Sequence, residues 1–127
     1  MDTDKGILWL RLDEPSRARL LQACPPRHAT TYCHHVTLRH GVTAQEYEAL
    51  FGRQCTVEVY EACWDGSVQA VRVNTHGLPD QYGVPHVTIS AADGIAPFTS
   101  VAMLKDPAHH HQKLSLELSG VIEFVAF

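Results

Sequence analysis

Two short stretches of the sequence place a histidine and a threonine two residues apart, between apolar residues. The first is His35-Val36-Thr37-Leu38, and the second, fifty-one positions later, is His86-Val87-Thr88-Ile89. In a β-strand, residues i and i+2 point to the same face, so each stretch presents an imidazole beside a hydroxyl. An imidazole can move a proton while a hydroxyl donates a hydrogen bond to a phosphate oxygen. Two such units facing one groove could cleave a phosphodiester by general acid–base chemistry.

Other polar residues extend this candidate site. Arg39 follows the first stretch and Ser90 follows the second. By strand alternation, each is expected on the same face as the histidine of its stretch. Tyr82 lies in the loop before the second stretch, where its ring could stack on a base. We therefore expect these three residues to bind substrate. His34 should point away from His35, because neighbouring residues of a strand alternate between faces.

The rest of the chain supplies the elements that must position these residues, and its patterns predict a single α+β domain over residues 1–127, mainly antiparallel. The first half is expected to contain a strand at 6–13, a helix at 14–24 with Pro15 in its first turn, a strand at 32–39, and a helix at 42–52 with a Thr43–Glu46 capping box and a terminal Gly52. A hairpin around Asp65-Gly66 and a loop at 75–85 follow. The last elements are a strand at 85–91, a short helix at 96–104, and a long strand at 113–127 with a bulge at Ser119-Gly120.

The composition of the chain limits the kinds of partner and the compartment that we expect. The formal net charge of −4 argues against a long polyanion lying across a basic face. No apolar stretch approaches the roughly 20 residues that span a membrane. We expect no signal peptide, and the four cysteines (Cys24, Cys33, Cys55 and Cys63) are scattered, which is typical of free thiols in a reducing compartment. We expect a cytoplasmic or nuclear monomer.

Nine histidines are an unusual number for this length. Three of them form the run His109-His110-His111, and no cysteine or aspartate lies at zinc-site spacing from that run. A histidine-rich metal-binding module is therefore disfavoured, and we expect neither a metal nor a cofactor. Trp9 and Trp64 lie in apolar runs and are expected in the core.

The paired His-Val-Thr-Leu and His-Val-Thr-Ile motifs resemble the two-histidine (2H) phosphoesterase superfamily, whose signature is His-hydrophobic-(Thr/Ser)-hydrophobic written twice. The similarity is closest to the cyclic phosphodiesterase domain of plant- and fungal-type tRNA ligases. It extends to three further stretches in family order: the first strand and helix at 12–21, the residues around the second motif at 85–97, and 116–124 near the end. The resemblance implies a bilobal fold of two pseudo-symmetric, mainly antiparallel β-rich halves, with helices outside and a central groove.

The resemblance also implies a reaction. It is the metal-independent hydrolysis of a 2′,3′-cyclic phosphate, at an RNA end or on a nucleotide, to a monophosphate. His35 and His86 become the acid–base pair, and Thr37 and Thr88 become the donors to the phosphate oxygens. Which histidine is the base stays open. The alternatives are a phosphodiesterase for another cyclic phosphate, on ADP-ribose or a signalling nucleotide, and a module that binds RNA ends or nucleotides without turnover.

Overall fold

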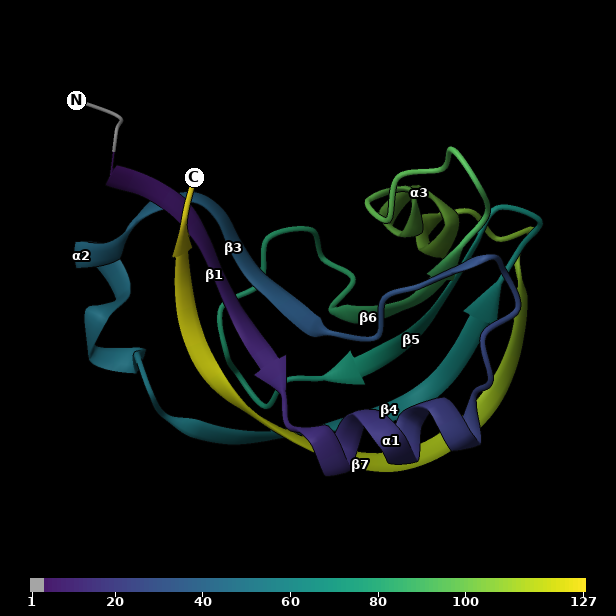
Figure 1. The fold of residues 1–127 in the computed structure, drawn as a ribbon, viewed down its shortest axis with the longest axis horizontal. Coiled ribbons are helices and arrows are strands. Elements are labelled where there is room, and N and C mark those ends of the chain that lie inside the picture. The colour runs from purple at the N-terminus through teal and green to yellow at the C-terminus, as the bar shows by residue number, and fades with distance from the viewer. Residues whose placement is uncertain (1–3) are drawn as a thin grey trace.

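The structure is a computed structural model that describes residues 4–127, an α+β fold that is mostly antiparallel β-sheet (Figure 1). The elements in chain order are β1 (Lys5–Leu12), α1 (Glu14–Ala23), β2 (Thr30–Thr31), β3 (His35–Thr43), α2 (Ala44–Tyr47), the 3-10 helix η2 (Glu48–Leu50), β4 (Gln54–Trp64), β5 (Val68–Asn74), β6 (His86–Ala91), α3 (Thr99–Lys105) and β7 (His110–Ala126).

Six of the strands close into a barrel. The strand order is β2-β6-β3-β1-β7-β4-β5, and β5 also pairs with β6, which completes the ring and leaves the two-residue β2 as an appendage of β6. Every pairing is antiparallel. Because β1 pairs with β7, the start of β1 lies beside the end of β7 (Figure 1). Closure removes the exposed sheet edges that otherwise invite pairing with other chains.

The helices lie around the barrel. Helix α1 runs along β7, α2 contacts β1 and β3, and α3 covers β5 on the side of the molecule away from α2 (Figure 1). None of the helices within residues 4–127 combines the length and the apolar character needed to cross a membrane.

Apolar side chains fill the barrel because each strand alternates its faces. In β1, for example, every second residue is buried and the others are half-buried. Each fully buried Leu, Ile or Val stabilises the fold by about 1.5–3 kcal/mol. The largest of these side chains are Leu8, Leu10, Leu20, Leu38, Ile89, Leu118 and Ile122. A smaller cluster lies under α3 and contains Cys63, Val68, Ala70, Ala91, Met103 and Leu104.

The predicted start of the first helix, the capping box of the second and the hairpin are confirmed. The Asp13 carboxylate accepts a hydrogen bond from the Ser16 amide at 2.9 Å, and Pro15 lies in the first turn of α1. Glu46 accepts from the Thr43 amide at 3.0 Å, as the capping box requires. Asp65 caps the hairpin between β4 and β5 by accepting from the backbone amides beyond it.

Two predicted elements have different bounds. The strand expected at 32–39 begins only at His35, because Cys33 takes a left-handed conformation with φ 51° that interrupts extended backbone. The helix expected at 42–52 is a four-residue α2 followed by η2, and neither buries a side chain. A helix without a buried face gains little from tertiary packing, so only its capped first turn is regular.

The bulge expected at Ser119-Gly120 is also wrong. Gly120 stays in regular register, opposite Leu12 on β1 and Cys55 on β4. The register between β4 and β7 shifts instead between Val59 and Glu61. Gly120 allows β7 to approach β1 closely, because a Cβ at position 120 would lie 2.3 Å from the Arg11 carbonyl oxygen.

Gly120→Ala is therefore expected to destabilise the protein by roughly 1–3 kcal/mol, the usual cost of overpacking. The measurement is the free energy of unfolding in urea. Gly66→Ala is the matched control, because a Cβ at position 66 meets nothing within 4 Å. Equal unfolding free energies for the two variants would contradict the close approach of β1 and β7.

Candidate functional site

The two His-Val-Thr motifs lie side by side where β3 meets β6. The two strands share one register pair, Val36 opposite Val87, and both valines are fully buried. The residues that flank each valine point to the other face. Antiparallel register then sets His35 across from Thr88, and Thr37 across from His86. The motifs are thus related by a local two-fold axis, with their polar side chains on one face.

A cavity of about 470 Å³ opens on that face. Its size is within the range of sites for small molecules, and its lining is mostly apolar and aromatic with a few polar groups. The lining residues are Ile7, Tyr32, His34, His35, Thr37, His40, Tyr82, His86, Thr88, Pro97, Phe98 and Val101. Four of the sequence-predicted catalytic side chains and the predicted stacking residue therefore border one cavity.

His34 also borders the cavity, so the expectation that it points away from His35 is wrong. The left-handed Cys33 lies just before it, and the Cys33 amide bonds to the Thr88 carbonyl at 2.8 Å. His34 therefore stands outside the regular strand. The Nδ1 atoms of His34 and His35 are 3.1 Å apart, so one of them carries the hydrogen and the other accepts it.

Trp9 supports His35 from β1. The two rings stack with centroids 4.2 Å apart, and the indole Nε1 donates to Glu123 at 3.2 Å. Trp9 is half-buried on the outer face, across from Thr37, and does not belong to the core as expected. Trp64 is likewise half-buried, with the Arg27 guanidinium 3.8 Å above its ring. An apolar sequence neighbourhood does not distinguish these outer positions from inner ones.

The surroundings of His35 favour a neutral imidazole. Burial lowers its pKa to about 4, and the nearby positive charges of His34 and His86 add to the effect. Desolvation disfavours the charged form because a buried imidazolium loses its hydration. His35 is therefore a proton acceptor over most of the pH range.

The surroundings of His86 favour a protonated imidazole more than those of His35 do. Burial lowers its pKa, but a hydrogen bond to the Val84 carbonyl and the charge of Asp80 oppose that effect, while Arg72 reinforces it. The bond from Nδ1 to the Val84 oxygen is 2.7 Å long. A carbonyl only accepts, so Nδ1 carries the hydrogen, and Nε2 is left for a ligand.

The two threonines differ in their partners. Thr88 Oγ1 lies 2.9 Å from Ser100 Oγ, and Ser100 is fully buried at the start of α3. Within residues 4–127, Thr37 Oγ1 has no hydrogen-bond partner. One hydroxyl is thus positioned by a helix, and the other is available to a ligand.

Arg39 does not reach the cavity. The register between β1 and β3 shifts by one residue at Leu38, which forms a bulge. Beyond this bulge, His40 rather than Arg39 borders the cavity. The pKa of Glu46 is lowered by hydrogen bonds from Thr43 and, less strongly, by the charge of Arg39, so the guanidinium lies toward α2. Its Nε is buried without a hydrogen-bond partner among the described residues. The prediction that Arg39 binds substrate is therefore not supported by its position.

Strand alternation also predicts the wrong position for the Ser90 side chain. Its side chain is fully buried, and its hydroxyl donates to Gln69 Oε1 at 2.6 Å while accepting from the His28 amide. The register between β5 and β6 shifts opposite Ser90 and Thr88, which turns the end of β6 inward. Ser90 is a structural residue away from the cavity, and not a substrate-binding one.

Sequence reasoning missed four residues that border the cavity: Tyr32, His34, His40 and Phe98. Phe98 is 61% exposed and meets the Tyr82 ring edge-on at a centroid distance of 5.2 Å. The two rings form an aromatic surface that borders the cavity. The sequence carries no signal that groups these four residues, since they come from separate loops and from a bulged strand.

No family model matches the chain, and a search of the curated proteins finds no match.

Acid should destabilise the protein through His35. Its pKa is about 4 in the folded state against an ordinary value near 6.5, so the folded state binds fewer protons. The resulting stabilisation, on the order of 3 kcal/mol, is complete above pH 6.5 and is lost as the pH falls toward 4. We expect His35→Gln to flatten the loss of unfolding free energy between pH 7 and 4.5. The exposed His110→Gln should keep the wild-type slope, and identical slopes for all three proteins would contradict the shift.

Proposed function

We propose that this protein is a two-histidine phosphoesterase that hydrolyses 2′,3′-cyclic phosphates without a metal ion. The observation that carries the proposal is the antiparallel pairing of the two His-Val-Thr motifs at one cavity. Two imidazoles and two hydroxyls then surround a space that a phosphate can enter.

His35 acts as the general base in this proposal. Its lowered pKa keeps it neutral, so it can take a proton from a water molecule as that water attacks phosphorus. Stacking on Trp9 fixes the ring against rotation. His34 shares a hydrogen with its Nδ1 and is a positioning residue rather than a proton carrier to substrate.

His86 acts as the general acid. The Val84 carbonyl and Asp80 favour its protonated form against the effect of burial. Protonated Nε2 can then deliver a proton to the departing ribose oxygen while Nδ1 keeps its bond to Val84. The proton gained by one histidine and lost by the other balances over the turnover, and exchange with water restores both.

The threonine hydroxyls stabilise the phosphate oxygens. Ser100 can donate its hydrogen to Thr88 Oγ1, and the Thr88 hydroxyl can exchange its long 3.4 Å bond to the Pro97 carbonyl for one to a phosphate oxygen. Thr37 can donate without giving up another bond. Donors already in place cost little reorganisation as charge builds up on phosphorus.

The cavity also limits the substrate. Among residues 4–127, its lining contains no Asp, Glu, Lys or Arg, so of these side chains only the histidines bring formal positive charge to the phosphate. A bound phosphate in turn favours the imidazolium of His86. Tyr82 and Phe98 offer aromatic surfaces for a base. A cavity of about 470 Å³ suits a nucleotide or the terminal nucleotide of an RNA, in keeping with the net charge of −4.

The bilobal architecture of the superfamily belongs to the same proposal. The local two-fold relation of the motifs supports it, because two similar half-units would meet there. Their strands are part of a single closed barrel, so the halves share one core.

The direct test is incubation with 2′,3′-cyclic nucleotides, with and without EDTA, and chromatographic separation of the monophosphates. Product should form equally in both. His35→Ala and His86→Ala should each lower kcat/KM by about 10²–10⁴-fold, the contribution of a positioned acid or base. His110→Ala, far from the cavity, should keep wild-type activity. Full activity in His86→Ala would refute the mechanism, and saturable binding without product would indicate a nucleotide-binding module. Turnover restricted to cyclic phosphates on ADP-ribose or a signalling nucleotide would move the assignment to that substrate class.

The pH dependence of kcat/KM should be bell-shaped with its maximum on the acid side of 6.5. The rising limb follows His35, whose pKa is about 4, and the falling limb follows His86, whose pKa is also lowered. Asp80→Asn removes a charge that raises the pKa of His86, so it should move the falling limb to lower pH. Asp93→Asn, exposed in another loop, should leave both limbs in place. A maximum above pH 7, or no movement in Asp80→Asn, would contradict the assignment of roles.

A further inference from the structure

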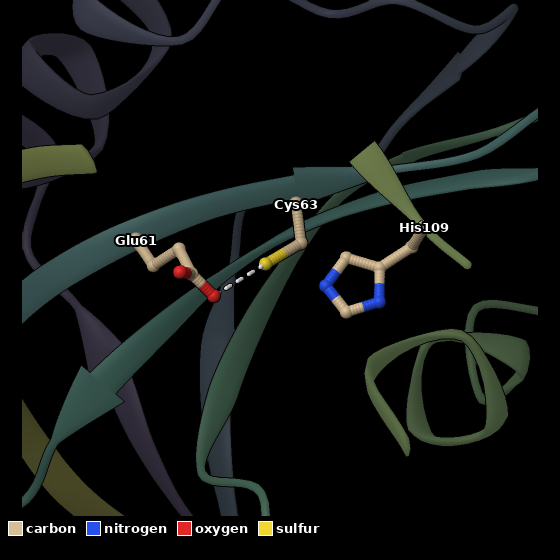
Figure 2. A group of neighbouring side chains, drawn as sticks. All are labelled: Glu61, Cys63 and His109. Carbon is tan, nitrogen blue, oxygen red and sulfur yellow. Dashed lines mark hydrogen bonds between the residues drawn. The ribbon is translucent and has the colours of Figure 1, made fainter. Parts of the chain in front are cut away.

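A second group of reactive side chains lies away from the cavity, where β4 meets the start of β7. Glu61 and Cys63 come from β4, and His109 comes from the turn before β7 (Figure 2). One ligand atom from each of these three side chains lies within 4.8 Å of the others. Carboxylate oxygen, thiol sulfur and imidazole nitrogen are three kinds of ligand that bind zinc in proteins.

Strand pairing explains why these residues meet. Glu61 and Cys63 are two positions apart in β4 and share a face. Cys63 lies directly opposite His111 in the register with β7, so His111 shares that face, and His109 precedes it by two residues. His110 is turned away and stacks on Trp64.

The atoms are near the separations that a zinc ion needs. Bond lengths of about 2.0–2.3 Å in a tetrahedral site put ligand atoms about 3.3–3.8 Å apart. Cys63 Sγ is 3.3 Å from Glu61 Oε1, and His111 Nδ1 is 3.6 Å from Glu61 Oε2. His111 is exposed, so its ring can rotate into the fourth position at little cost.

The outer partners also suit a metal site. His109 Nδ1 donates to the Asp106 carbonyl, which orients the ring and leaves Nε2 for a ligand. Figure 2 shows one nitrogen of this ring turned toward the Cys63 sulfur. The Arg72 guanidinium donates to Glu61 Oε1 at 3.0 Å, which holds the carboxylate in place beside Cys63. Zinc-binding histidines usually donate their second ring N–H to a carbonyl or carboxylate in this way.

We propose that Glu61, Cys63, His109 and His111 form a zinc-binding site that joins β4 to the start of β7. Zinc is favoured over calcium or magnesium because those ions take oxygen ligands. Four protein ligands leave no open position, which is the pattern of a structural site. On binding, the Cys63 thiol releases its proton to solvent as the zinc–sulfur bond forms. The thiolate and the carboxylate then neutralise the charge of the ion.

The ligands come from strands nearly fifty residues apart, so spacing along the sequence did not reveal them. The His109–His111 run alone predicts no site, because three consecutive rings cannot reach one ion. Burial of Cys63 beneath His109 supplies the sulfur that the run lacks.

The test is a zinc titration of the full chain, stripped of metal, against a chromophoric chelator. We expect one zinc per chain. Cys63→Ser and His109→Gln should each weaken binding at least ~100-fold, since even outer partners of zinc ligands contribute about 10–100-fold. His110→Gln, which is turned to the other face, and Cys55→Ser, which lies near the opposite end of β4 across from Gly120, are matched controls, and they should bind like the wild type. With Co²⁺ as a probe, the thiolate-to-metal absorption should disappear in Cys63→Ser and persist in His110→Gln.

His111→Gln protects the test against a folding defect at the buried Cys63, because position 111 is exposed and its change should weaken zinc without unfolding the chain. Equal losses in His109→Gln and His110→Gln would overturn the proposal, as they would indicate a surface histidine run only. The absence of a stoichiometric zinc in the wild type would also overturn it. None of these measurements uses the hydrolysis of cyclic nucleotides, so their outcome is independent of whether the protein has the proposed activity.

Discussion

The pairing of Val36 with Val87 is the constraint on which both the barrel and the cavity depend. It is the single register pair between β3 and β6, and it closes a ring whose other five seams are longer. Burying both valines forces their neighbours to the outer face, where each histidine meets the threonine of the other motif. A slip of one residue would send the valines outward and the catalytic candidates into the core. Core packing therefore specifies the chemistry.

Desolvation lowers the pKa of both histidines, and their other neighbours make them different. The Trp9 side of the cavity surrounds His35 with rings and a second histidine, which favours the neutral base. The Val84 side gives His86 a carbonyl acceptor, which stabilises a proton on the ring. Two groups of one type in distinct environments can hold the acid and the base roles at the same pH.

Arg72 connects the cavity with the metal-ligating cluster. Its backbone lies opposite His86, while its side chain bonds to Glu61 at 3.0 Å and to the Leu104 carbonyl at 2.6 Å. These bonds hold a permanent cation out of the cavity, so histidine is the only side chain among the described lining residues that can carry a positive charge. They also fix the carboxylate that the cluster presents. One side chain thus contributes to the electrostatics of both places.

The sequence by itself determined the local features: strand alternation in the two motifs, the caps of α1 and α2, and the hairpin at Asp65. These follow from backbone geometry and nearby side chains, which a short stretch contains in full. Only the tertiary structure decided which residues meet across strands. The left-handed Cys33 brings His34 to the cavity, the slips in register remove Arg39 and Ser90 from it, and pairing of β4 with β7 gathers a metal-ligating cluster. Register is set by long-range burial, and no neighbouring residue encodes it.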